Sequence, residues 1–179
     1  MMKRFFIFML GFLVFAGCSS LRVNHDYDTE FNFTKQQSFA VAHHNREGDD
    51  TLHNDRVLKA LEADLVSKGY TKTKKEDADL VFVFHTSVEN KTDIDTDYQM
   101  VGYRRFGYGG AMIATTNTYH YTKGTLIVDA LNPNDEKIVW RGIATDTLNE
   151  KKTPEKRTEY INEVITELMK VFPSKTVAK

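Results

Sequence analysis

Two amphipathic helical stripes enclose a succession of strand-like runs, and this order constrains the fold more than any other feature. The first stripe follows a capping residue at Asn54 or Asp55 and ends at Gly69, which suits the left-handed residue at a helix C-terminus. The second follows Thr153 and Pro154, a capping hydroxyl ahead of a proline at the first helical position. The apolar positions recur every three or four residues, as Val57, Leu58, Leu61 and Leu65, and as Tyr160, Ile161, Val164, Ile165, Leu168, Met169 and Phe172 up to Pro173.

The strand-like runs lie within residues 21–32 and at residues 38–42, 79–86, 115–121, 124–131 and 137–147. The run 79–86 contains consecutive apolar residues and predicts a central strand covered on both faces. A turn at 132–135 makes the last two runs a hairpin, in which Arg141 pairs with Asp129 and Trp140 packs on the sheet. We therefore predict a single α+β domain, with a mainly antiparallel sheet of five or six strands and both helices on one face.

The composition sets further limits. A chain of 179 residues that is 41% hydrophobic has the size of one domain with one core. The formal net charge is -1, so no basic excess is available to bind a phosphate backbone, which argues against nucleic-acid binding. A single cysteine excludes an internal disulfide, a cysteine-rich zinc site and CxxC redox chemistry.

The N-terminus has the three parts of a bacterial export signal. Two basic residues precede an uncharged run, residues 5–17, which is shorter than the ~20 residues of a membrane-spanning helix. The only cysteine, Cys18, follows small residues, and this arrangement resembles the lipobox of bacterial lipoproteins. We expect residues 1–17 to be a lipoprotein signal peptide and Cys18 to carry the lipid anchor, including palmitate. The alternative is an ordinary signal peptide cleaved near Gly17, with an incidental cysteine.

The resemblance to lipoproteins also implies a location and a domain plan. Ser19 stands where Gram-negative bacteria place an Asp to retain lipoproteins in the inner membrane, so we expect an outer-membrane anchor facing the periplasm. Residues 18–33 are then the lipidated N-terminus, tether and first strand, 34–173 the α+β domain, and 174–179 a loose tail. The expected partners are the membrane, through the lipid, and an envelope protein or peptidoglycan.

Several short motifs match one protein family in order and spacing. In the first half they are Tyr27-Asp28, Phe31, Phe33, Lys68-Gly69-Tyr70 and Ala78-Asp79-Leu80. In the second half they are a Tyr- and Gly-rich segment, residues 124–129 (GTLIVD), residues 139–142 (VWRG) and Phe172-Pro173. With the lipobox cysteine, this pattern resembles the domain-of-unknown-function family 4136 of bacterial lipoproteins over nearly the whole mature chain. The resemblance implies a lipid-anchored envelope protein with an α+β domain and no assigned catalytic residues.

Residues 102–110 form the strongest candidate binding segment. The segment contains four glycines together with Tyr103, Arg104, Arg105 and Tyr108. Tyrosine offers a flat amphipathic surface, arginine offers forked donors for carboxylate or phosphate, and glycine allows close backbone approach. The alternative is a hairpin tip whose aromatic side chains fold back on the sheet.

Two polar clusters contain side chains that can bind metal ions. His43, His44 and His53 share the polar loop 43–53, but their spacing is not diagnostic of zinc, and a solvated loop is the alternative. Three aspartates alternate over residues 93–97, as on one face of a strand, where they face solvent or make a weak calcium contact. We predict no metal site and no cofactor.

No motif of nucleophilic catalysis occurs in the sequence, so we predict no catalytic residues. His85 closes an apolar run and is expected to be a partly buried structural histidine rather than a general base. Our leading hypothesis is a noncatalytic, lipid-anchored cell-envelope protein with a structural or accessory binding role. The alternatives are a periplasmic small-ligand or glycan-binding module that uses Tyr103, Arg104, Arg105 and Tyr108, and a metal-assisted hydrolase built on His43, His44 and His53.

Overall fold

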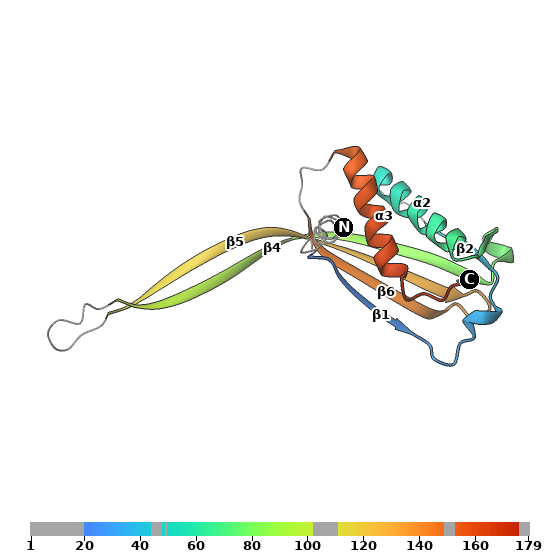
Figure 1. Ribbon diagram of the computed structural model, residues 1–179, viewed down its shortest axis with the longest axis horizontal. Coiled ribbons are helices and arrows are strands. Elements are labelled where there is room, and N and C mark those ends of the chain that lie inside the picture. The colour runs from blue at the N-terminus through green and yellow to red at the C-terminus, as the bar shows by residue number, and fades with distance from the viewer. Residues whose placement is uncertain (1–19, 44–47, 49, 102–110, 149–152, 176–179) are drawn as a thin grey trace, which may run out of the picture.

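The strands form one sheet in the order β1-β6-β5-β4-β2-β3, and two helices cover one of its faces (Figure 1). The computed structural model describes residues 20–43, 48, 50–101, 111–148 and 153–175. The strands are β1 (Arg22–Tyr27), β2 (Ser38–Val41), β3 (Thr71–Lys72), β4 (Leu80–Val101), β5 (Ala111–Asn132) and β6 (Lys137–Leu148). The helices are α2 (Thr51–Ser67) and α3 (Pro154–Met169), with single 3-10 turns η1 (Phe33–Lys35) and η2 (Lys75–Asp77).

The sheet is mixed. Strands β1, β6, β5 and β4 are antiparallel neighbours, whereas β2 runs parallel to both β3 and β4. The parallel pairs follow from the crossover through α2, since parallel neighbours need a long connection. The predicted α+β class and the hairpin of residues 124–131 with 137–147, which is β5 with β6, are confirmed.

The core lies between the sheet and the two helices. Phe82, Trp140 and Phe172 are almost completely shielded from solvent, and the rings of Phe82 and Trp140 both meet Phe172 edge to face at centroid distances of 5.3 Å. The predicted packing role of Trp140 is confirmed. Leu80, Phe82 and Phe84 alternate along β4 toward this core, as the period of two requires.

No α-helix covers the opposite face of the sheet among the described residues. The prediction that the run 79–86 is covered on both faces therefore holds at Val81, which is 4% exposed, but not at the half-buried Val83 or the exposed His85. On that face Val81 packs with the small side chains of Ala40 and Ala78. His85 is exposed, so it is not the partly buried structural histidine that we expected. The reason is that both helices lie on the same side of the sheet (Figure 1).

Both helices begin with side-chain caps. In α2 the Asp50 carboxylate accepts the His53 N–H at 3.0 Å, so the helix starts earlier than predicted and His53 lies in its first turn rather than in a loop. The predicted cap of α3 at Thr153 is confirmed. This helix ends at Met169, before the predicted end at Pro173, because the chain bends there to insert Phe172 into the core.

Asp79 joins the start of β4 to the start of β2. Its carboxylate accepts the N–H groups of Gln37 and Ser38 at 2.8 and 2.9 Å, and the Ser38 hydroxyl at 2.8 Å. These hydrogen bonds, that from the Gln37 N–H foremost, hold the pKa of the carboxyl below its ordinary value. Asp79 therefore fixes the relative position of two strands that are far apart in sequence.

The C-terminal segment is fastened to the body at its start. Ser174 and Lys175 begin the segment for which the sequence suggests a loose tail. Lys175 Nζ donates to the carbonyls of Phe33 and Thr34 at 2.8 and 2.5 Å and lies 5.4 Å from the centre of the Tyr70 ring. The Ser174 hydroxyl donates to a main-chain carbonyl at the end of α2.

Candidate functional site

A two-stranded ribbon extends from the sheet beyond the helices (Figure 1). Strands β4 and β5 have 22 residues each, and they pair continuously from Val81–Leu131 to Val101–Ala111. The last pair between β5 and β6 is Thr122–Leu148, so β4 and β5 continue without β6 from residues 91 and 121 outward. At about 3.4 Å per residue this part, which we call the ribbon, is ~37 Å long. The sequence predicts separate runs here, not one continuous pair of strands.

The ribbon has two faces of different chemistry, because side chains alternate across a strand. The threonine face carries Thr92, Ile94, Thr96, Tyr98, Met112, Ala114, Thr116, Thr118 and His120. The acidic face carries Lys91, Asp93, Asp95, Asp97, Gln99, Ile113, Thr115, Asn117, Tyr119 and Tyr121. The threonine face continues the side of β4 and β5 that packs on the helices.

Cross-strand hydrogen bonds hold the threonine face together. The Thr92 hydroxyl lies 3.0 Å from His120 Nδ1, and the hydroxyls of Thr96 and Thr116 are 3.4 Å apart. Large apolar side chains of this face are exposed to solvent. Ile94, between the two pairs, is 65% exposed, and Tyr98 and Met112, beyond Thr96–Thr116, are 68% and 70% exposed. These residues were not singled out from the sequence, although every second residue of both strands is uncharged.

The acidic face is solvated. Asp93, Asp95 and Asp97 are exposed and share one face of β4, as the sequence predicts. They pair with Tyr119, Asn117 and Thr115, so no opposing charge faces them across the ribbon. In the part of the chain that the structure describes, no three His, Cys, Asp or Glu side chains are grouped as a metal site would require.

The predicted binding segment joins the two strands of the ribbon. Tyr103, Arg104, Arg105 and Tyr108 lie outside the described residues. The pair Val101–Ala111 on either side of them is the last pair of the ribbon. The predicted lipidation site, Cys18, also lies outside the described residues.

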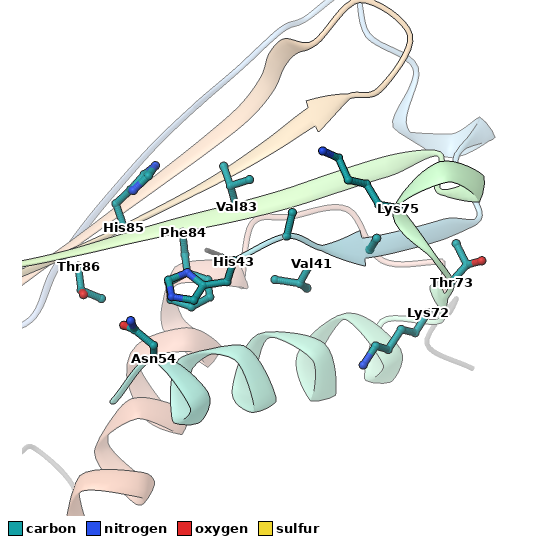
Figure 2. Close-up of a pocket in the computed structure, with 12 residues that line it drawn as sticks. Val41, His43, Asn54, Lys72, Thr73, Lys75, Val83, Phe84, His85 and Thr86 are labelled. Atoms are coloured by element: carbon teal, nitrogen blue, oxygen red, sulfur yellow. The ribbon is translucent and has the colours of Figure 1, made fainter. Parts of the chain in front are cut away.

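A groove of about 630 Å³ opens where β2 ends beside β4 (Figure 2). The Ala42 N–H donates to the Phe82 carbonyl at 2.8 Å, and beyond this point β4 continues without β2. The His43 ring stacks on the Phe84 ring at 4.2 Å. Figure 2 shows His43, Phe84 and Asn54 on the side of α2, and His85 on the other side of β4. The sequence did not predict this groove, because its lining comes from four separate segments of the chain.

The charge of the groove is one-sided. The titratable side chains among its described lining are His43, His85, Lys72 and Lys75, with no carboxylate. Lys72 is paired with Glu62, which lies outside the lining, at 2.6 Å. The groove therefore favours a neutral or anionic ligand over a cationic one.

The structure does not bring the candidate metal-binding histidines together. His43 lines the groove, whereas His53 lines a small apolar pocket at the base of the ribbon. Burial lowers the pKa of His53, which favours its neutral form. His44 lies outside the described residues. The described residues thus provide no support for a hydrolase built on these three histidines.

One predicted charge pair forms on the open face of the sheet. Arg141 Nε and Nη2 donate to the two carboxylate oxygens of Asp129 at 2.6 and 2.7 Å. Asp129 is 4% exposed, while the side chain of Arg141 is 44% exposed. This bidentate pair raises the pKa of Arg141 and ties β5 to β6, and it is a structural pair rather than a ligand site.

Three solved structures are similar to this chain. A PDZ domain protein from Parabacteroides distasonis is 12% identical with a TM-score of 0.58; the match covers 90% of this chain but 38% of that protein. A DUF4136 family protein from Bacteroides thetaiotaomicron is 18% identical with a TM-score of 0.48, covering 83% of this chain and 95% of that one. The PelC dodecamer from Paraburkholderia phytofirmans is 10% identical, also with a TM-score of 0.48, over 83% and 95%.

Sequence comparison identifies the family to which the chain belongs. No curated protein matches this sequence. Residues 23–174 match the family described as Domain of unknown function (DUF4136), which includes every strand and helix described above except the first residue of β1. The resemblance seen in the short motifs is therefore confirmed, and the chain belongs to the DUF4136 family.

Proposed function

We propose that this DUF4136 protein is a noncatalytic lipoprotein of the cell envelope, anchored by Cys18 in the outer membrane and facing the periplasm. The observation that carries the proposal is the lone cysteine at the end of an N-terminal apolar run. No helix among the described residues is long and apolar enough to span a membrane.

The ribbon supports a binding role. A two-stranded ribbon outside a core gains little stability by itself, and it presents side chains on two faces and at its end. Exposed Tyr98, Met112 and Ile113 lie on it, close in sequence to the candidate segment with Tyr103 and Tyr108. Aromatic, methionine and arginine side chains are those enriched at protein interfaces. In this proposal the connecting segment at the end of the ribbon binds an envelope protein or peptidoglycan.

Metabolic labelling with palmitate tests the anchor. The wild-type protein is expected to incorporate label, and Cys18→Ala is expected to incorporate none. Ser20→Ala, which leaves the cysteine intact, serves as the matched control. Equal labelling of Cys18→Ala and wild type would refute lipidation at this residue.

Photo-crosslinking in the native cells tests the binding role. A photoreactive residue at Tyr103 or Tyr108 is expected to give a discrete adduct with a protein or with peptidoglycan. The same residue at Lys137, whose side chain is 77% exposed on the body, is the control. Adducts that form equally well from Lys137, or from none of the three positions, would remove the connecting segment from the proposal.

The groove supports a second candidate function, the small-ligand or glycan-binding module. It offers an aromatic and imidazole stack, two lysines and about 630 Å³ of space, and it has no carboxylate among its described lining. A bound ligand would raise the melting temperature in proportion to the logarithm of its concentration. A shift with muropeptides or anionic sugars that Lys75→Ala abolishes would support this function. No shift with any of these ligands would reject it.

A further inference from the structure

The chain outside the structure limits where a lipid on Cys18 can lie. Ser20 is the first described residue, and its hydroxyl is hydrogen-bonded to Asp146 near the end of β6. Asp146 pairs with Gly124, two pairs from the last β5–β6 pair, Thr122–Leu148, and hence at the base of the ribbon. Only Ser19 lies between Cys18 and Ser20. Their Cα atoms are therefore two steps of 3.8 Å, at most ~7.6 Å, apart. A lipid anchor therefore places the base of the ribbon at the membrane surface.

The exposed apolar side chains gather on the same part of the molecule. Seven of the twelve large exposed hydrophobic residues among those described lie on β4 and β5 from Val88 outward. Val88, Ile94, Tyr98 and Met112 share one side, the threonine face and its continuation toward the body. A bilayer interface accepts such a mixture of aliphatic, methionine and tyrosine side chains.

The two faces of the ribbon differ in charge, and only the uncharged face is suited to contact lipid. Asp93, Asp95 and Asp97 project from the acidic face and are repelled by anionic headgroups. The threonine face carries no aspartate, glutamate, lysine or arginine at its described positions from residue 92 to 98 and from 112 to 120. Its Thr92–His120 and Thr96–Thr116 contacts also satisfy part of its polar atoms, which lowers the cost of removing them from water.

The geometry points to a lipid-surface contact: the threonine face of the ribbon lies on the bilayer to which Cys18 anchors the chain. This inference rests on the proposed lipid anchor. The ribbon lies in the headgroup region and does not cross the hydrocarbon, because the outer main-chain edges of a two-stranded ribbon have no partner strand there. The acidic face, with the aspartates, is directed toward the periplasm.

The test separates this contact from native lipidation by supplying the anchor artificially. The chain from residue 18 onward, with Cys18→Ser and an N-terminal histidine tag, is tethered to vesicles of phosphatidylethanolamine, phosphatidylglycerol and a nickel-chelating lipid. Because Cys18 is the only cysteine, single cysteines can be labelled with an environment-sensitive fluorophore. Ile94→Cys and Met112→Cys report on the threonine face. Asp95→Cys, one residue from Ile94, and Asn117→Cys, its pairing partner, report on the acidic face.

Tethering is expected to increase the emission at residues 94 and 112 at least two-fold, with a shift to shorter wavelength, and to leave residues 95 and 117 unchanged. An equal response of both faces, or no response, overturns the inference even if palmitate labelling confirms the anchor. A response at 94 and 112 that appears without vesicles as protein concentration rises indicates contact between copies of the chain and also overturns it. A failure of palmitate labelling, with the expected fluorescence intact, rejects the native anchor alone.

Discussion

Gly142 is the residue at which one added methyl group should do most damage to the core. It lies in β6 between Trp140 and the helix α3, on the face that packs against the helices. A Cβ at this position would lie 2.4 Å from Trp140 Cη2 and 2.8 Å from Leu168 Cδ1. Ordinary carbon contacts are about 3.5–4.0 Å, so the substitution Gly142→Ala requires the indole or α3 to move.

The loss of stability in Gly142→Ala depends on how far Trp140 and Leu168 can move. Trp140 and Leu168 are at most 1% exposed, and an indole has no flexible end that can turn away. Overpacking of such a site costs about 1–3 kcal/mol, and we expect the upper half of that range. The loss of glycine's freedom in the unfolded chain offsets about 0.4–1 kcal/mol. The expected net loss in the free energy of unfolding is about 2 kcal/mol, or a fall in melting temperature of about 4–8 °C.

Gly124→Ala is the matched control. It is also a strand glycine, but its added Cβ meets the terminal carbons of Leu148 at 2.9–3.0 Å, a half-buried side chain that can rotate. Both substitutions remove the same unfolded-state entropy, so the difference between them isolates the packing cost. Urea unfolding should show a lower midpoint for Gly142→Ala with an unchanged slope, and a change within ~0.5 kcal/mol for Gly124→Ala. Equal stability of the two variants would refute the reasoning.

Three further predictions concern charged groups. Arg141→Met should lower the free energy of unfolding, measured by urea titration, by about 2–3 kcal/mol, because it leaves the buried Asp129 carboxylate unpaired. Adding Asp129→Asn to this variant should restore part of the lost stability. The pKa of Asp79 is lowered in the folded protein, so the ionised carboxylate stabilises the fold fully above its ordinary pKa of 3.8, and this stabilisation is lost as the pH falls through the lower pKa of the folded state. Asp79→Asn should lower the free energy of unfolding by about 1–2 kcal/mol at neutral pH and should weaken the loss of stability in acid. Burial lowers the pKa of His53, so the unfolded chain binds a proton at this residue more readily and the free energy of unfolding falls as the pH drops below 6.5. His53→Gln should remove this pH dependence of stability between pH 7 and 5. An unchanged pH dependence would contradict the lowered pKa of His53.

The sequence predicted those helices and strands that bury one face, because burial gives their apolar residues a regular spacing. The apolar stripes of both helices and the alternation in residues 124–131 and 137–147 face one core, so the periodicity identifies them. The Arg141–Asp129 pair could be predicted from the same alternation, since a four-residue turn between the two strands places these residues opposite each other. The start of α2 was missed because the polar segment before it contains several possible caps. Asn54, one of the predicted caps, is instead a buried residue inside the helix.

The ribbon could not be predicted in the same way. Its described side chains are mostly exposed on both faces, so no apolar period marks it as one continuous pair of strands. The sequence shows only separate pieces of it, the alternating aspartates of residues 93–97 and the run 115–121. What holds it together is cross-strand pairing, such as Thr96 with Thr116, and these residues are far apart in the sequence. The groove has the same property, since β2, β3 and β4 meet only in the folded sheet. Both features depend on register, which local sequence does not encode.

The length of the ribbon and the position of the proposed lipid anchor together argue against a purely structural hairpin. A turn that only connected β4 to β5 would need a few residues, yet each strand continues about ten residues past β6 without adding to the core. Such an extension has a cost, because each residue fixed in a strand loses about 1–2 kcal/mol of backbone entropy while its side chains remain in water. The aspartates add mutual repulsion on one face. A surface that removes Ile94, Tyr98 and Met112 from water would offset that cost, and with the proposed lipid anchor at the base of the ribbon the nearest such surface is the bilayer.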